Sequence, residues 1–193
     1  FNYFSSYTMH THHVLLYNIR KGNTQAFERV WDLFHEKIYR FVYLKLPTRQ
    51  DAEDITSDTF LKAWHYLKEG KNVSSLQALL YTIARNLVID FYRKRGTPTE
   101  SLDDNGEGEI VVADRFDLTL EEKMILKSDM EGVEDALRHL KDMFREIIVL
   151  RYLNGLSILE VAEIVQKSPQ AVRVILHRGL KILKELLEKN KKS

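Results

Sequence analysis

The chain has 193 residues, 44% of them hydrophobic, and a net charge of +1, which fits one domain or two small ones and excludes global disorder. It has no cysteine, which excludes disulfide frameworks and thiolate metal sites, and its three prolines among many Leu, Lys, Glu and Ile residues favour an all-α class. No apolar run approaches the roughly 20 residues that a spanning helix needs, and no secretory segment opens the chain, so we expect a cytoplasmic protein without membrane insertion.

Residues 1–20 are interpreted as an N-terminal extension, because residues 1–13 lack a hydrophobic period. Met9 is a candidate native start, which leaves open whether residues 1–8 are native. The extension contains three histidines, His10, His12 and His13, that could bind a metal ion. No carboxylate supports them, so an incidental cluster is favoured and no metal is expected.

The first predicted helix starts at about Thr24 and ends at Pro47. Its apolar stripe consists of Phe27, Val30, Trp31, Phe34, Ile38, Phe41 and Val42. The pair His35-Glu36 invites comparison with zinc proteases. Position 39 is Tyr where a second histidine would be required, so that interpretation fails.

The second predicted helix opens with Thr48 and Asp51, which have the spacing of a capping box. Asp51, Asp54 and Asp58 follow at spacings of three and four, which places three carboxylates on one face. Like charges in a row cost stability, so this face suggests a basic partner. Alternatively Asp51, Glu53 and Asp54 complement the helix dipole, although Asp58 lies beyond the first turn. A two-metal carboxylate site would need Glu-x-x-His ligands, which this helix lacks.

A polar loop, Glu69–Ser74, separates this helix from a third one that Ser74 and Gln77 are expected to cap. We expect its aliphatic side chains to be buried and its other side to mix aromatic and cationic groups, namely Tyr81, Arg85, Asn86, Tyr92, Arg93, Lys94 and Arg95. Such surfaces suit single-stranded nucleic acid, because bases stack on rings while cations hold phosphates. Tyr and Arg are also common on any helix surface.

Residues 96–120 carry Gly, Pro, Asp and Asn without a stable period and are interpreted as an acidic linker between two helical domains. Nine acidic side chains and one arginine occur in residues 96–122, whereas residues 165–193 hold eight Lys or Arg and two Glu. The small net charge is therefore the sum over a chain that contains one strongly acidic segment and one strongly basic segment.

Helix is expected to resume near Glu122, and the last helix before the next motif should stop at Asn154-Gly155. A capping box at Ser157 and Glu160, then an N-cap and first-turn proline at Ser168-Pro169, predict two helices joined by a tight turn, with a small residue, Ala162, where their axes approach. This pattern is typical of a helix-turn-helix. The second helix should expose Gln170, Arg173, His177, Arg178 and Lys181 toward a major groove. The alternative is an αα-hairpin with a solvated basic face.

In this order the helices resemble those of extracytoplasmic-function bacterial sigma factors. Residues 22–43 are similar to the opening helix of sigma region 2, residues 51–64 to its core-binding segment, and residues 79–95 to its promoter-melting helix. Residues 134–183 are similar to region 4 throughout. The resemblance implies two small helical domains, region 2 at 21–95 and region 4 at 128–193, joined by an acidic flexible linker at 96–127.

The resemblance also implies partners: the core RNA polymerase through its β′ clamp coiled coil and β flap, promoter DNA, and an anti-sigma factor. Asp51, Glu53, Asp54 and Asp58 would bind the clamp. The −10 element would be held by Lys71, Asn72, Tyr81, Arg85, Asn86, Arg93 and Lys94. The −35 element would be read by Ser168, Gln170, Arg173, Val174, His177, Arg178 and Lys181. The linker would thread toward the RNA exit channel, and the protein would act at the nucleoid.

Three positions depart from the family pattern. Leu79 stands where an aromatic is usual, Gln166-Lys167 occupy a turn that usually contains a small residue or Gly, and Val174-Ile175 replace residues that are often Ser and Arg. If Val174 faces the groove, it can touch a thymine methyl but cannot read guanine by a bidentate bond. Alternatively the apolar pair packs against an inhibitor or a neighbouring helix.

We therefore interpret the chain as a sigma factor and not an enzyme, with no cofactor. The sequence contains no nucleophile–base pair, phosphate-binding glycine loop or metal cluster. A stand-alone helix-turn-helix regulator that binds duplex DNA without polymerase is the alternative. A protein that sequesters another regulator through its N-terminal domain is a third class.

Overall fold

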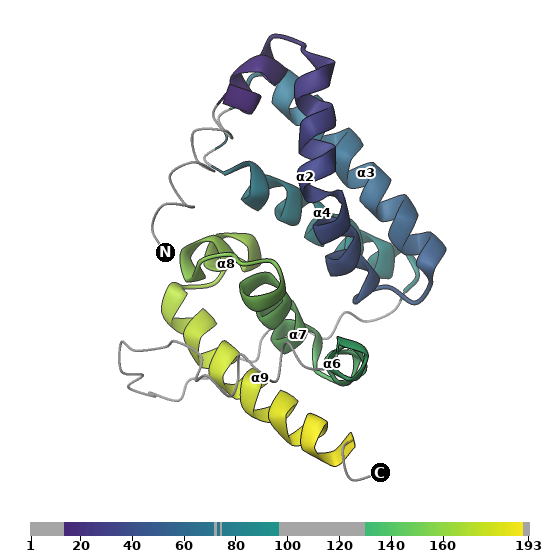
Figure 1. Ribbon diagram of the computed structural model, residues 1–193, viewed down its shortest axis with the longest axis vertical. Coiled ribbons are helices and arrows are strands. Elements are labelled where there is room, and N and C mark those ends of the chain that lie inside the picture. The colour runs from purple at the N-terminus through teal and green to yellow at the C-terminus, as the bar shows by residue number, and fades with distance from the viewer. Residues whose placement is uncertain (1–13, 72, 74, 97–129, 191–193) are drawn as a thin grey trace. The chain divides into compact units, whose positions relative to one another are not determined.

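The computed structural model describes residues 14–71, 73, 75–96 and 130–190 of the chain, and the regular structure of these residues is helical (Figure 1). They form two compact units, one from residue 14 to 96 and the other from 130 to 190. The all-α class is confirmed. The predicted linker lies outside the described residues except for Gly96, so its boundaries stay a prediction.

The first unit contains α2 (Thr24–Tyr43), α3 (Arg49–Lys68) and α4 (Leu76–Lys94), each packed against the other two. A short helical segment at residues 14–20 precedes them. The core is aliphatic and aromatic, and its fully buried side chains include Ile19, Ile38, Phe41, Phe60, Leu67, Leu76 and Leu80. Burying each such side chain contributes about 1.5–3 kcal/mol, so packing of the amphipathic faces holds the three helices together.

Two boundaries in this unit differ from the sequence-based expectation. The prediction that Pro47 ends the first helix is wrong, because α2 stops at Tyr43 and its C-cap residue Leu44 is buried in the core together with Leu46. The N-cap of α4 is Ser75, whose hydroxyl accepts the backbone N–H of Ala78 at 3.2 Å. Sequence spacing alone does not separate two adjacent serines, each of which is a good N-cap residue.

The second unit contains α6 (Met130–Arg138), α7 (Asp142–Ile148), α8 (Ile158–Val165) and α9 (Pro169–Asn190). Helix α7 continues into a π-helical turn, η1 (Val149–Leu153), which the sequence did not indicate. Asn154 caps this turn, its N–H bonding the carbonyl of Val149 at 3.0 Å, and Gly155 follows with φ of 74°. The predicted stop at Asn154-Gly155 is confirmed, whereas the predicted restart near Glu122 lies outside the described residues.

Helices α8 and α9 form the predicted helix-turn-helix. The capping box of α8 is complete, since the Ser157 hydroxyl accepts the N–H of Glu160 at 3.2 Å and the Glu160 carboxylate accepts the N–H of Ser157 at 2.9 Å. Helix α9 is capped by Ser168, whose hydroxyl accepts the N–H of Ala171 at 3.1 Å. The turn passes through Gln166, which has a φ of 56° in the left-handed region.

Replacing Gln166 by glycine is expected to raise the free energy of unfolding by about 1 kcal/mol, because a left-handed residue with a Cβ costs roughly 1–2 kcal/mol. Urea unfolding followed by far-ultraviolet circular dichroism measures the change. Among non-glycine described residues Gln166 alone has a positive φ, so Lys167→Gly next to it is the matched control. That control should lose about 0.5–1 kcal/mol through added chain entropy. If both variants change the free energy of unfolding by the same amount, the left-handed backbone at Gln166 is not strained.

A close approach of α9 to α7 at Gly179 was not predicted. A Cβ atom built on Gly179 would lie 3.1 Å from the Cβ of Phe144 and 3.1 Å from the Cδ1 of Ile148. Gly179 is thus the residue that lets the backbone of α9 approach α7. A glycine inside a helix costs about 1 kcal/mol relative to alanine, so its presence here follows from packing.

Candidate functional site

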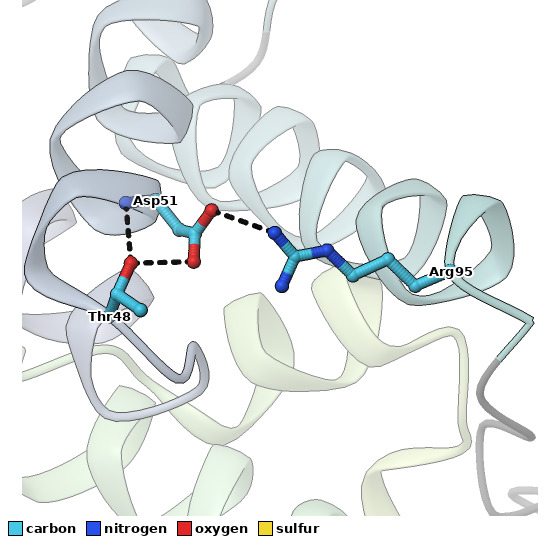
Figure 2. A network of polar contacts seen from close by, with 3 residues as sticks. All are labelled: Thr48, Asp51 and Arg95. Carbon is cyan, nitrogen blue, oxygen red and sulfur yellow. Dashed lines mark hydrogen bonds and ion pairs between the residues drawn. The ribbon is translucent and has the colours of Figure 1, made fainter.

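The acidic row on α3 divides into an inward and an outward part. Figure 2 shows that Asp51 is engaged within the unit: its carboxylate accepts the Thr48 hydroxyl at 2.6 Å and lies 3.2 Å from the guanidinium of Arg95. The Asp51 side chain is only 19% exposed. Thr48 in turn accepts the N–H of Asp51 at 3.1 Å, so these residues cap α3 and tie its start to the end of α4.

The other acidic side chains of α3 face solvent. Asp54 and Asp58 are exposed one turn apart, and Glu53, also exposed, lies 3.3 Å from Arg49 across one helical turn. Asp51 lies on the predicted face but is engaged within the unit, in the cap of α3 and in an ion pair with Arg95, so its role in binding polymerase stays a prediction. Asp54 and Asp58 form the part of the row that can meet a basic partner. Neither lies in the first turn, so the helix dipole does not account for them.

The loop after α3 brings one candidate cation to the surface. The ammonium of Lys71 lies 2.5 Å from the carboxylate of Glu69 and 4.8 Å from the ring centre of Tyr66. The hydrogen bond to Lys71 lowers the pKa of the Glu69 carboxyl, and the same bond raises the pKa of Lys71. Arg20 donates to the Lys71 carbonyl at 3.0 Å, which connects the N-terminal segment to this loop. Asn72, another predicted residue, lies outside the described residues.

Helix α4 presents a different face from the one that the sequence suggested. Tyr81 is fully buried and Arg85 is buried as well, so the expectation that both lie on an exposed stacking surface is wrong. The ring of Tyr81 packs edge-on against Phe41, with ring centres 5.3 Å apart. Tyr92 shares this inward face and donates its hydroxyl to the carbonyl of Lys45. The large apolar ring of tyrosine suits a core, and residues four and eleven positions apart return to the same helix face.

The outward face of α4 carries the remaining predicted residues. Asn86, Arg93 and Lys94 are exposed, and Arg93 lies 2.9 Å from the carboxylate of Asp90. Leu79 is half-buried on the same stripe, seven residues before Asn86. The position where the family usually has an aromatic therefore belongs to the face that carries the polar candidates. A role in binding for Tyr81 and Arg85 stays a prediction that their burial does not support.

The burial of Tyr81 leads to a stability prediction. Its hydroxyl has no hydrogen-bond partner among the described residues, and burial raises its pKa. Tyr81→Phe is therefore expected to raise the free energy of unfolding by about 1 kcal/mol at neutral pH. Since the folded pKa is raised, the tyrosine form should also lose stability as pH rises above about 10, where the unfolded phenol ionises, and the variant should lack that part of the loss. Urea unfolding at several pH values measures both effects; a less stable variant would contradict them.

An aromatic ladder on α2 was missed by the sequence interpretation. The rings of Trp31, His35, Tyr39 and Tyr43 stack in succession, with centres 4.4, 6.4 and 5.8 Å apart. Trp31 also lies 4.6 Å from Phe60 of α3 and is 37% exposed. The signal is present in the sequence as four rings at i, i+4 spacing, but the apolar period places Trp31 in the buried stripe.

The predicted residues of α9 occupy its solvent-facing side. Gln170, His177 and Lys181 are exposed, whereas Arg173, Val174 and Arg178 are half-buried. The opposite side of the helix is buried in the second unit through Val172, Leu176 and Leu183. Ser168 is exposed, with its hydroxyl acting as the N-cap of α9. The helix-turn-helix thus presents amide, cationic and methyl groups together.

The described residues contain no group of three or more His, Cys, Asp or Glu side chains arranged to hold a metal ion. In the same residues no helix is both long and apolar enough to cross a membrane. What the two units present is a set of charged and polar helix faces. Such faces are suited to binding macromolecules.

Comparison with known proteins identifies both units. Residues 30–97 match the family model of sigma-70 region 2, and residues 130–183 match that of sigma-70 region 4. The chain is 30% identical to the ECF RNA polymerase sigma factor SigW of Bacillus subtilis over 177 residues, which cover 88% of this chain and 92% of SigW. It is also 30% identical to the sigma factor BldN of Streptomyces coelicolor over 90% of this chain, but it spans only 64% of BldN.

Solved structures support the same fold. The sigma factor RpoE of Bartonella quintana, determined in complex with the anti-sigma factor NepR, is 26% identical and matches with a TM-score of 0.63 over 84% of this chain and 96% of RpoE. CnrH, determined with the cytosolic domain of CnrY, is 23% identical and matches with a TM-score of 0.66 over 91% of this chain and 96% of CnrH. The latter likeness concerns the fold alone.

Proposed function

Because the chain belongs to the ECF family of RNA polymerase sigma factors, we propose that it directs core RNA polymerase to specific promoters and helps to open them. The observation that carries the proposal is the order of two sigma-70 regions in one chain, each in its own compact unit. A stand-alone helix-turn-helix regulator would need only the second unit. The proposed function gives a role to both units.

The first unit would supply the contact with polymerase. Asp54 and Asp58 of α3 face solvent at i, i+4 spacing. Glu53 is also exposed, but it lies about 100° around the helix from Asp54 and pairs with Arg49. A basic coiled coil such as the β′ clamp is the complementary partner, because opposite charges steer association and fix register. Asp51 would act indirectly in this proposal, by holding the start of α3 against Arg95.

The same unit would hold the melted −10 strand. Lys71, Asn86, Arg93 and Lys94 offer exposed cations and an amide for phosphates and unpaired bases. Asn72 is assigned to this site on the resemblance alone. Capturing bases that have left the duplex stabilises the open state, so opening would be driven by binding free energy.

The second unit would read the −35 element as duplex DNA and meet the β flap. In helix-turn-helix proteins the second helix lies in the major groove with its N-terminal residues on base edges. In this proposal Gln170 and Val174 would meet the bases and Lys181 would lie near phosphates. Sigma factors are non-enzymatic initiation factors, and the polymerase carries out the chemistry. The chain would therefore act in the cytoplasm, with polymerase on the nucleoid.

An inhibitory partner is part of the proposal. The neighbour RpoE was solved bound to an anti-sigma factor, and an inhibitor of that class is the partner expected for this chain. The polymerase, promoter DNA and an anti-sigma factor thus form the expected set of partners, with no cofactor.

Run-off transcription with the purified full chain and a bacterial core polymerase tests the proposal. Genomic fragments that yield discrete transcripts only when the chain is present are the expected result. The core enzyme alone is the control for promoter-independent initiation. Duplex binding by the chain without any effect on core polymerase would favour the stand-alone regulator, and inhibition of another sigma factor without promoter-specific transcripts would favour a sequestering protein.

A further inference from the structure

Arg95 is held in place by an aromatic ring and by a carboxylate. It is the C-cap residue of α4, and its guanidinium lies over the ring of Phe91, 4.0 Å from the ring centre. One of its nitrogens donates to Oδ1 of Asp51 at 3.2 Å, and its side chain is 53% exposed (Figure 2). Because a ring face attracts a cation by itself, the guanidinium keeps its place at the end of α4 when the bond to Asp51 opens.

The two carboxylate oxygens of Asp51 have separate tasks. Oδ2 accepts the Thr48 hydroxyl at 2.6 Å, and Thr48 accepts the N–H of Asp51 at 3.1 Å, so the cap of α3 does not depend on Oδ1. Oδ1 accepts Arg95. A pair as solvated as this one is screened by water and shifts an equilibrium by about fivefold at most. Another charged group can therefore displace either partner without unfolding the start of α3.

Asp51 lies in the same sector of α3 as the two solvent-facing aspartates. At 100° per residue Asp51, Asp54 and Asp58 fall within about 60° of one another around the helix. A basic partner that docks on Asp54 and Asp58 therefore brings its cations within one turn of Asp51. Those cations compete with Arg95 for Oδ1. Once Arg95 has left, Asp51 adds a third carboxylate to the contact.

Arg95 also belongs to a run of three cations at the end of α4. Arg93 and Lys94 precede it and are exposed, and Arg93 lies 2.9 Å from the carboxylate of Asp90. Carboxylates of the unit itself thus hold two of the three cations. Asp90 stands on α4, whereas Asp51 stands on α3. Of these two pairs, the one with Asp51 joins the cations of α4 to the surface proposed for polymerase.

Beyond the positioning role of Asp51, we infer that its ion pair with Arg95 is an exchangeable link that masks a phosphate-binding arginine in the free chain. Core polymerase on α3 takes Asp51, and Arg95 then binds a phosphate of the unpaired strand. Because such coupling is reciprocal, a strand that takes Arg95 also strengthens the binding of polymerase. The inference rests on the proposed function and adds a regulation to it, since the chain gains a nucleic-acid contact when it joins polymerase.

Arg95→Gln tests the polymerase side of the exchange without any DNA. It frees Asp51 in advance, so binding to immobilised core polymerase, measured by biolayer interferometry, should strengthen about threefold. Arg93→Gln is the matched control, because it removes the same charge two residues away but releases Asp90. It should strengthen binding less than about 1.5-fold, through charge steering alone. In an Asp51→Asn background the gain from Arg95→Gln should disappear.

The outcomes of this experiment separate the inference from the proposed function. If Arg95→Gln and Arg93→Gln change the affinity for core polymerase alike, or if the gain persists in the Asp51→Asn background, the exchange is overturned and the proposed function stands. A wild-type chain that does not bind core polymerase overturns both. Urea unfolding of each variant, followed by circular dichroism, checks that the first unit remains folded.

Asp51→Asn tests the nucleic-acid side with the free chain. The amide keeps an oxygen for the Thr48 hydroxyl but releases Arg95. Affinity for a fluorescent single strand of about twelve mixed-sequence nucleotides should therefore rise about threefold, and its salt dependence should steepen by about 0.7, the slope of one phosphate contact. Fluorescence anisotropy at several salt concentrations measures both.

Asp54→Asn is the control for this second measurement. It removes the same charge from an exposed position of the same helix, so it should raise the affinity for the strand slightly and leave the salt slope unchanged. The added slope of Asp51→Asn should vanish in the double variant with Arg95→Gln. An unchanged slope in Asp51→Asn, or an equal change in Asp54→Asn, overturns the assignment of Arg95 to a phosphate.

Discussion

Replacing both Asp54 and Asp58 by lysine is expected to weaken binding of the chain to core RNA polymerase about 100-fold. Both carboxylates are exposed one turn apart on α3, so the double variant turns an attractive surface into a repulsive one. Like charges brought together at an interface cost several kcal/mol, and about 2.8 kcal/mol corresponds to this factor. Biolayer interferometry with immobilised core polymerase measures the loss, which should be largest at low salt.

A matched reversal on the neighbouring helix serves as the control. Glu28 and Asp32 of α2 are also exposed and four residues apart, so Glu28→Lys with Asp32→Lys changes the charge by the same amount. This variant should lose less than about fivefold, through long-range steering alone. Both double variants should unfold at the wild-type urea concentration. Equal losses of affinity in the two variants would show that net charge, and not the surface of α3, decides binding.

Asp51→Lys is expected to act through stability and so identifies a different role for the first aspartate. It removes the bond to Thr48 and the ion pair with Arg95, and it places a cation at the positive end of the helix dipole. Unfolding of the first unit at a lower urea concentration is the expected result. If Asp51→Lys keeps wild-type stability but loses polymerase binding, Asp51 belongs instead to the surface that contacts polymerase.

The second large effect is expected at Gly179. Gly179→Val adds three carbon atoms where the first already meets Phe144 and Ile148 at 3.1 Å, so α9 must move away from α7. Overpacking of this kind costs typically 1–3 kcal/mol, and we expect a loss of about 3 kcal/mol in the second unit. Urea unfolding followed by circular dichroism measures the loss.

Lys184→Val on the exposed side of the same helix is the control. It introduces the same β-branched residue without a packing partner, so only helix propensity changes, by about 0.5 kcal/mol. A loss of duplex binding in Gly179→Val should accompany unfolding and should disappear at urea concentrations where the variant remains folded. A Gly179 variant as stable as wild type would mean that α7 yields to the added atoms.

The helices and the helix-turn-helix could be predicted because their signals are local. The caps at Thr48, Ser157 and Ser168 lie within three residues of the N–H groups that they bind, and the apolar period of α2 spans the whole helix. The chain also belongs to the predicted family. Its two regions were inferred from residues that the family models match.

The sequence-based predictions were wrong at positions whose environment is set by contacts between residues far apart in the sequence. A polar hydroxyl favours a surface position for Tyr81, yet its ring packs on Phe41, forty positions away in the sequence. The partner of Asp51 is Arg95, which no spacing rule connects to it. Gly179 is likewise explained only by the side chains of α7. The contacts proposed for polymerase and DNA stay predictions.

The aromatic ladder of α2 gives the chain a built-in optical reporter. The protein has two tryptophans, Trp31 and Trp64, and both belong to the first unit. Trp31 stacks on His35 while Trp64 lies 5.0 Å from the ring centre of Phe27, so their emission reports the packing of α2 on α3. Unfolding of the second unit is visible to circular dichroism but contributes no indole signal. If Gly179→Val changes the urea concentration at which the tryptophan emission changes, the size of that shift measures how strongly the two units are thermodynamically coupled.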